Sequence, residues 1–327
     1  MALEKFGQYV LLEVRDAGGA VILSTDSLRV DFDVRNIKGF STGKFTIYNL
    51  SPSTIKSLFH GENYVTISTR LHGGSLRVIA KDMFISNTLD EIKVPDGVTM
   101  LFAYSRLRKD FLEKHISVPI EQSRGVSLER SIDLIKIAAG HTGRINYINF
   151  PPEKLTFIPP GAEKNGVKLE GTVGAVFKGL GYIHGFNIYT DDTFIDMICK
   201  PEASNLPDTD LFKSDNVIRL DTRNMRATPK VGPAQLGVKS NLDPNIKPGS
   251  VLDVTDLLTI STSVDSDVLE VANSVLKNKV AGFSKYLALS VQHQGSNWAD
   301  SWQTNVSATS PSPGTEMSTD KWWITGY

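Results

Sequence analysis

Acidic residues at a predicted hairpin tip come closest to an acid–base or metal site in this sequence. Asp191 and Asp192 lie between two apolar runs, and Asp196 lies within the second run. Neighbouring carboxylates can share a proton or bind a cation. An Asp pair at a turn also satisfies backbone donors without any ligand, and the pattern favours this structural role. As an enzyme, the chain would use Asp191 and Asp196 as the acid and base of a carbohydrate hydrolase.

Histidine and cysteine form no metal-binding pattern. Metal ligands usually come as close-spaced pairs, but the six histidines are dispersed along the chain: His60, His72, His115, His141, His184 and His293. Cys199 is the single cysteine, so no internal disulfide can form, and its apolar surroundings predict a small buried side chain. We therefore expect no metal and no cofactor.

Glycines near residue 180 superficially resemble a phosphate-binding loop. Gly179, Gly181 and Gly185 come at the end of a helical stripe, whereas dinucleotide binding needs glycines at the start of a helix, where free N–H groups face the phosphate. The pattern predicts instead that Gly181 ends the helix. The chain contains no G-x-S-x-G, H-E-x-x-H or Walker sequence. The sequence therefore predicts a protein that is not an enzyme.

The overall charge gives no direct sign of a nucleic-acid or membrane partner. Thirty-five basic and 36 acidic residues give a net charge of −1 over 327 residues, whereas a protein that holds DNA by bulk charge is usually basic. No apolar run approaches the length of a membrane span and no signal peptide is recognisable. We expect no membrane insertion.

The chain contains two local clusters of like charge, although its net charge is close to zero. A basic cluster lacks the interleaved aromatic residues needed for base stacking and is interpreted as a solvated face or as salt-bridge partners; it consists of Arg106, Arg108, Lys109 and Lys114. Residues 251–276 contain five acidic residues and no Lys or Arg: Asp253, Asp256, Asp265, Asp267 and Glu270. Such a surface repels a phosphate backbone and suits a passage better than a binding site.

The first 105 residues predict mainly β-strands. Val30, Phe32 and Val34 alternate with Asp31 and Asp33, which places one set on a buried face. Gly-rich turns separate such runs, so an antiparallel barrel or sandwich is expected. The expected strands are 9–14, 20–23, 28–34, 44–48, 64–70, 76–89 and 98–104, with one short helix capped by Ser51.

Residues 106–205 predict a separate α+β unit. Ser127 caps a helix that Gly140 stops, and Thr172 caps a second helix. A surface loop is expected over 149–166, between these helices, and a hairpin over 186–199 follows the second one.

Residues 206–308 return to strand-like patterns, with an amphipathic helix expected over 266–279. The expected strands are 217–220, 234–239, 251–254, 257–261, 287–293 and 302–308. The tail 309–327 is expected to be flexible at its start and to end in aromatic residues that need a surface. The predicted fold is mainly β: two β-barrel, tube-like domains, 1–105 and 206–308, flank the α+β insertion 106–205.

Three phrases of the sequence together resemble a known family. They are GKFTIYNLSPSTIKSL at 43–58, VKSNLDPNIKPG at 238–249 and YLALSVQHQGSNWADSWQTNVSA at 286–308. In this order they resemble the baseplate hub proteins of tailed phages, relatives of late control protein D and of the hub half of type VI secretion spike proteins. The matching residues are Asn49, Leu50, Ser51, Asn241, Leu242, Pro244, Pro248, Gly249, His293, Gly295, Trp302 and Thr304.

The resemblance implies a structural late protein of the virion tail baseplate, assembled in the host cytoplasm. Three copies would form a homotrimer, a pseudo-sixfold ring that joins the tail tube protein to the threefold spike protein and contacts other baseplate proteins. DNA would pass through its channel without specific binding. The five acidic residues of 251–276 are expected to line this channel, and four tryptophans are candidate partner or subunit contacts: Trp298, Trp302, Trp322 and Trp323. For Trp302 and His293, packing inside a barrel is the favoured alternative.

Two other functions remain open from the sequence. A cell-wall-degrading enzyme would need the carboxylates of 191–196 in a cleft. A carbohydrate-binding protein at the tail tip would stack Trp298 or Trp322 on a glycan.

Overall fold

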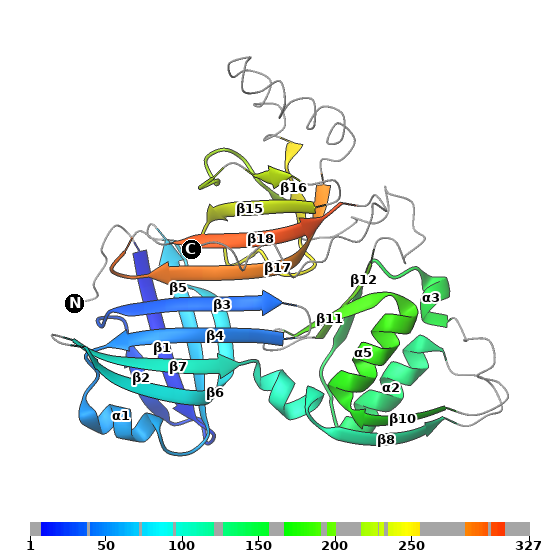
Figure 1. The fold of residues 1–327 in the computed structure, drawn as a ribbon, viewed down its shortest axis with the longest axis horizontal. Helices are drawn as coiled ribbons and strands as arrows, with labels where there is room; N and C mark the ends of the chain where they lie inside the picture. The colour runs from blue at the N-terminus through cyan, green and yellow to red at the C-terminus, as the bar shows by residue number, and fades with distance from the viewer. Residues whose placement is uncertain are drawn as a thin grey trace, which may run out of the picture.

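The computed structural model has a mainly β fold with a few helices (Figure 1). The mainly β prediction is confirmed, whereas closure into two separate barrels stays a prediction. The structure describes residues 8–37, 40–71, 74–93, 96–120, 127–156, 167–190, 195–200, 217–227, 229–231, 235–255, 285–299 and 302–310.

The first β part contains every strand that the sequence predicts, each of them longer than expected. Its elements are β1 (Gln8–Asp16), β2 (Val21–Thr25), β3 (Val30–Ile37), β4 (Phe40–Tyr48), α1 (Pro52–Leu58), β5 (Asn63–Leu71), β6 (Arg77–Lys93) and β7 (Asp96–Tyr104). Helix α1 begins as predicted, because the Ser51 hydroxyl accepts a hydrogen bond from the Thr54 N–H at 3.2 Å. Asn49, at the corner before it, has a φ of +59° and accepts from the Gly97 N–H.

The middle part has two small sheets and its own hydrophobic core. Its elements are η1 (Arg108–Leu112), β8 (His115–Ile120), α2 (Leu128–Ala139), β9 (Ile145–Ile148), α3 (Pro152–Thr156), β10 (Val167–Thr172), α5 (Val173–His184), β11 (Phe186–Thr190) and β12 (Ile195–Cys199). Strand β10 pairs with β8, and β12 lies between β11 and β9. Helices α2 and α5 lie beside the three-stranded sheet (Figure 1). Their predicted N-caps, Ser127 and Thr172, are confirmed.

The predicted end of the second helix is wrong. Helix α5 continues through Gly181 to His184, and Gly185 is the left-handed C-cap, with a φ of +68°. A Cβ on Gly181 would come within 2.6 Å of the Phe186 carbonyl oxygen, so this glycine serves close packing within the helix. The expected loop 149–166 also contains a short helix, α3, since Pro152 stands at a helix start, where its missing N–H costs nothing.

The second β part is built from strands on either side of a long segment that lies outside the described residues. Its strands are β13 (Val217–Arg219), β14 (Lys230–Val231), β15 (Gln235–Asn241), β16 (Val251–Asp253), β17 (Lys285–Ser296) and β18 (Gln303–Thr309). The strand expected at 257–261, the helix expected at 266–279 and the tail beyond residue 310 all lie outside the described residues.

A single sheet of 13 strands contains both β parts. Its main path runs β14-β15-β18-β17-β3-β4-β7-β6-β5-β1-β2, and β13 and β16 join it beside β17. Strand β17 is the connection, because it pairs with β16 and β18 of its own part and with β3 of the first part. Figure 1 shows β17 and β3 side by side. None of the helices in the described ranges has the length and apolar character needed to cross a membrane.

Candidate functional site

The contact between β17 and β3 brings together residues about 260 positions apart. The strands are antiparallel, with His293 opposite Val34 and Gly295 opposite Phe32. A Cβ on Gly295 would come within 2.5 Å of the Phe32 ring, so only glycine lets the strands approach with this ring in place. We call this contact the seam.

Trp302 packs on the core side of the seam. Its side chain is 1% exposed and belongs to the core of the first β part. Its ring meets Phe32 edge to face, with centroids 6.0 Å apart, and its indole N–H donates to the Ser296 carbonyl oxygen. Trp302 is therefore a packing residue in this chain, which is the alternative that the sequence favoured over a partner contact.

The hairpin between β17 and β18 is fixed to the first β part by Asn297. This side chain is 1% exposed; its amide oxygen accepts from the Val30 N–H at 2.8 Å, and its NH₂ donates to the Leu28 carbonyl oxygen at 2.7 Å. Trp298 follows at the hairpin tip and is 43% exposed. Asn297 was not singled out from the sequence, because its partners are some 270 residues away.

His293 is buried on the same side of the seam as Trp302. Its Nδ1 lies 3.0 Å from the Thr304 hydroxyl, which also accepts from the Asp243 N–H. Burial lowers the pKa of His293 to about 4, although a hydrogen bond with the backbone of Ile246 opposes this shift. The ring is therefore neutral at pH 7 and serves packing, as the favoured alternative predicted.

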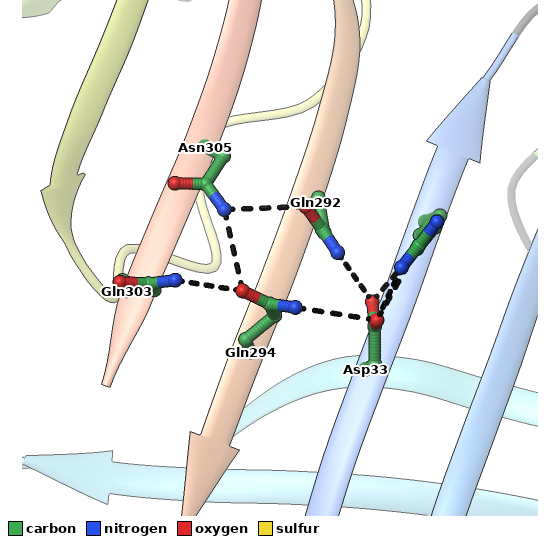
Figure 2. Close-up of polar contacts among 6 residues, drawn as sticks. Asp33, Gln292, Gln294, Gln303 and Asn305 are labelled. Atoms are coloured by element: carbon green, nitrogen blue, oxygen red, sulfur yellow. Dashed lines mark hydrogen bonds and ion pairs between the residues drawn. The ribbon is translucent and has the colours of Figure 1, made fainter. Parts of the chain in front are cut away.

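The opposite side of the seam carries a network of carboxamide groups centred on one carboxylate (Figure 2). Gln292 and Gln294 of β17 donate to the two carboxylate oxygens of Asp33 on β3, at 2.8 and 3.2 Å. From β18, Gln303 donates to the Gln294 side-chain oxygen at 2.7 Å, and Asn305 donates to both Gln292 and Gln294. We call these five residues the amide face. Their alternation with Val291, His293 and Thr304 is visible in the sequence, but their convergence with Asp33 is not.

The carboxylate at the centre of this network, Asp33, is paired with an arginine. Burial acts to raise the pKa of Asp33, but hydrogen bonds from Arg35, Gln292 and Gln294 outweigh it and hold the pKa below its usual value. Arg35 lies 2.7 Å from the Asp33 carboxylate.

Asp31, two residues before Asp33 on β3, has partners of the same kind. It accepts from Tyr48 at 3.0 Å and from Ser296 at 2.5 Å, and pairs with Arg29 at 3.3 Å. Both carboxylates of β3 are therefore compensated.

The basic cluster lies where the first β part meets the middle part. Arg106 pairs with Asp110 at 3.0 Å, and Lys109 pairs with Glu62 at 2.7 Å. The same cations also lie over aromatic rings, with Lys109 4.0 Å from the ring centre of Phe84. The predicted role as salt-bridge partners is confirmed for Arg106, Arg108 and Lys109, whereas Lys114 donates to the Ala139 carbonyl oxygen at 2.8 Å.

The residues considered for catalysis or metal binding form no such site in the described part of the chain. Asp196 accepts from Asn146 at 2.7 Å, while Asp191 and Asp192 lie outside the described residues. Cys199 is buried, as predicted. Among the described residues, no group of three or more His, Cys, Asp or Glu side chains could hold a metal ion.

Only one of the five acidic residues of 251–276 is described. Asp253 is half-buried on β16, where its neighbours in register are Arg219 of β13 and Lys285 of β17. Its carboxylate accepts from the Thr255 hydroxyl at 2.6 Å. The other predicted site residues lie outside the described residues: Asp256, Asp265, Asp267, Glu270, Trp322 and Trp323.

No protein-family model matches the chain, and no curated protein matches its sequence. Solved structures do match its fold. The 43 kDa tail protein of prophage MuSo2 from Shewanella oneidensis has a TM-score of 0.50 and 8% identity, over 93% of this chain and 97% of that one. A tail protein from Neisseria meningitidis MC58 has a TM-score of 0.48 and 10% identity, over 92% of this chain and 96% of that one.

A further match is an E. coli component of the type VI secretion system, described as similar in structure to the T4 bacteriophage tail proteins gp27 and gp5. Its TM-score is 0.49 at 10% identity, over 86% of this chain and 72% of that one. The likeness to the MuSo2 protein shows that this chain has the fold of a phage tail protein.

Proposed function

We propose that this chain is a structural hub subunit of a phage tail baseplate. The observation that carries the proposal is the likeness of its fold to the MuSo2 tail protein over 93% of the chain. In the proposed assembly three copies form a ring that joins the tail tube to the spike, within the virion tail. No catalytic role is proposed.

The organisation of the sheet supports the proposed ring. Each chain carries two antiparallel β parts, joined into one sheet at the seam. Three chains would then present six β parts, and such a ring can meet a sixfold tube on one side and a threefold spike on the other. In this proposal residues 1–105 and 206–308 are the tube-like domains, 106–205 is the insertion, and 309–327 is the tail.

The proposed partners are the tail tube protein, the spike protein and other baseplate proteins. Trp298, exposed at its hairpin tip, is a proposed contact residue, because a large exposed aromatic side chain gains much by burial at an interface. Trp322 and Trp323 are proposed contacts on the basis of the sequence. DNA is proposed to pass through the ring, with Asp253 and the other acidic residues of 251–276 contributing to the channel wall.

The mass of the full chain in solution tests this proposal. We expect a trimer, alone or with the spike protein, and a central hole in electron micrographs of the purified ring. Trp298→Ala should weaken association with a partner, whereas Tyr182→Ala, at an exposed position on the middle part, should leave it unchanged. A chain that remains a monomer with every tail component would overturn the proposal, and specific binding on a glycan array would favour the carbohydrate-binding alternative.

A further inference from the structure

A cavity of about 150 Å³ lies at one end of the seam, between the two β parts. Its walls come from β3, β4 and β6 of the first part and from β17 and the loop between β15 and β16 of the second part. An engineered cavity of about 150 Å³ binds benzene, so a small polyatomic ligand fits in this volume.

The buried side of the seam changes from apolar to polar where it reaches the cavity. Along β3, Phe32 and Val34 face the core, and the next residue of this alternation is Asn36. Ser41 of β4 pairs directly with Asn36 and is 3% exposed. His293 of β17, opposite Val34, is 1% exposed and also lines the cavity. Polar side chains thus form the inner wall at positions where the strand pattern places core side chains.

Strand β6 is irregular beside the cavity. Its pairing with β5 shifts in register on both sides of Ile67, and its Asp82 has a φ of +48°. Residues 78–81 all line the cavity, whereas a regular strand directs only alternate residues to one side. A bulge can re-aim a side chain and is common beside functional sites. The irregularity of β6 accounts for the presence of Lys81 in the cavity wall.

The charged side chains in the cavity wall are both cationic. They are Lys81 of β6 and Lys247 of the loop, and each belongs to an exposed residue, which places it at the mouth. No acidic residue of the described ranges lines the cavity; Asp82 and Asp243, the nearest along the chain, lie outside its wall. An ammonium group has three donors, so a contact with one neighbour leaves others for an anion.

We propose that this cavity binds a small tetrahedral oxyanion, with a phosphate group as its ligand. Lys81 and Lys247 supply charge-assisted hydrogen bonds at the mouth. The Asn36 carboxamide and the Ser41 hydroxyl supply neutral donors on the inner wall. The bound anion contacts both β parts and therefore stabilises the seam. The site does not depend on the proposed hub function.

Calorimetry on the full chain with inorganic phosphate tests the site, with chloride at the same ionic strength as the reference. We expect saturable binding. Lys81→Gln with Lys247→Gln should weaken it by about tenfold or more, because each substitution removes a charge-assisted bond. The matched control is Lys230→Gln with Lys285→Gln, at exposed positions of the second β part outside the cavity wall, which should bind phosphate as the parent chain does.

A change of charge on the inner wall gives a second test. Asn36→Asp keeps the size of the side chain and adds a negative charge, so it should abolish measurable binding. Asn87→Asp, at an exposed position of β6 outside the cavity wall, should retain it. If Asn36→Asp fails to fold, the two lysine substitutions keep the test valid, because they lie at exposed positions.

The ring protons of His293 report where the anion binds. Their NMR signal, identified by its loss in His293→Gln, should shift as phosphate is added at constant ionic strength. The signal of His115, which is exposed and lies outside the cavity wall, should not shift.

The source of the phosphate group is distinguished by a parallel titration with glycerol 3-phosphate. Binding of inorganic phosphate alone identifies the free anion as the ligand, and binding of the ester identifies the phosphate group of a larger molecule; both support the inference. Absence of saturable binding by either compound, or equal affinity of the Lys81→Gln, Lys247→Gln variant and the parent chain, would overturn the inference and leave the hub function standing.

Discussion

The first β part is joined to the second β part and to the middle part by contacts of different kinds. At the seam, a backbone ladder between β17 and β3 is covered on one side by the buried Trp302 and on the other by the amide face. At the middle part, side-chain ion pairs and cation–π contacts lie on the surface, such as Lys109 with Glu62 and Phe84. The seam therefore resembles the packed interior of a protein, whereas the second junction resembles a surface contact.

This difference has a physical consequence for movement. Buried apolar area and paired backbone groups are lost together when strands separate, so the seam opens only with global unfolding. Exposed ion pairs contribute little and are screened by salt. We expect the two β parts to move as one body. The middle part is also held to the second β part by a buried cluster of Tyr189, Ile198, Val251 and Leu287, so the exposed ion pairs of the second junction are the contacts that yield most easily.

The largest effect is expected from the core side of the seam. Trp302→Ala should lower the free energy of unfolding by roughly 3–5 kcal/mol, because it leaves a large cavity beside Phe32. Trp298→Ala is the matched control and should change it by less than about 0.5 kcal/mol. Urea unfolding followed by circular dichroism measures both. Equal effects of the two substitutions would show that the seam is no part of the core.

A pH effect of similar size is expected from His293. Its pKa of about 4 lies below the ordinary value of 6.5, so the unfolded chain binds the proton first as the pH falls. Stability should therefore be complete above pH 6.5 and decline toward pH 4, with a loss of roughly 2–3 kcal/mol at pH 4.5.

His293→Gln should remove this part of the pH dependence, whereas replacement of the exposed His115 by Gln should retain it. Urea unfolding at pH 7 and pH 4.5 provides the comparison. If His293→Gln loses as much unfolding free energy between pH 7 and pH 4.5 as the parent chain does, groups other than His293 cause the loss of stability in acid.

A smaller effect is expected at the hairpin tip. Asn297→Ala removes two hydrogen bonds and leaves the Val30 N–H buried without its partner, which should cost roughly 1–3 kcal/mol. Asn245→Ala, at an exposed position, serves as the control. Urea unfolding again gives the values. Retention of full stability in Asn297→Ala would mean that the hairpin is not fixed to β3 by this side chain.

The smallest effect is expected where the middle part joins the first β part. Glu62→Gln removes the ion pair with Lys109, which contributes to the lowered pKa of Glu62. Melting temperature should fall slightly at low salt and should match the parent chain in about 1 M salt, where screening is nearly complete. Glu129→Gln on α2 is the control. If Glu62→Gln lowers stability as much as Trp302→Ala does, the two junctions do not differ in strength.

Sequence reasoning predicted the parts of the fold that depend on local chemistry. The helix starts at Ser51, Ser127 and Thr172 are confirmed because an N-cap side chain bonds to a backbone N–H two or three residues away. The alternation of apolar and polar residues likewise predicted which strand positions are buried. The prediction that Gly181 ends its helix was wrong. Local preference alone favours a glycine at a helix end, but this glycine is required because the Phe186 carbonyl oxygen lies too close for a Cβ.

The seam could not be predicted from local chemistry. The pairing of β3 with β17 joins residues 255 to 265 positions apart, and nothing in either strand specifies the other. The uncharged alternation of Gln292, Gln294, Gln303 and Asn305 is visible in the sequence, but nothing in it identifies Asp33 as their partner.

The distant partner of β3 also bears on how the chain is made. At about 5–20 residues per second, a ribosome needs roughly 13–50 s to proceed from Asn36 to its partner Val291. During that interval the edge of β3 lacks its neighbour and offers a template for aggregation. Asp31, Asp33 and Arg35 alternate along this strand, and charges at an edge are a known protection against such pairing. The residues that support the amide face in the finished chain thus protect the nascent one.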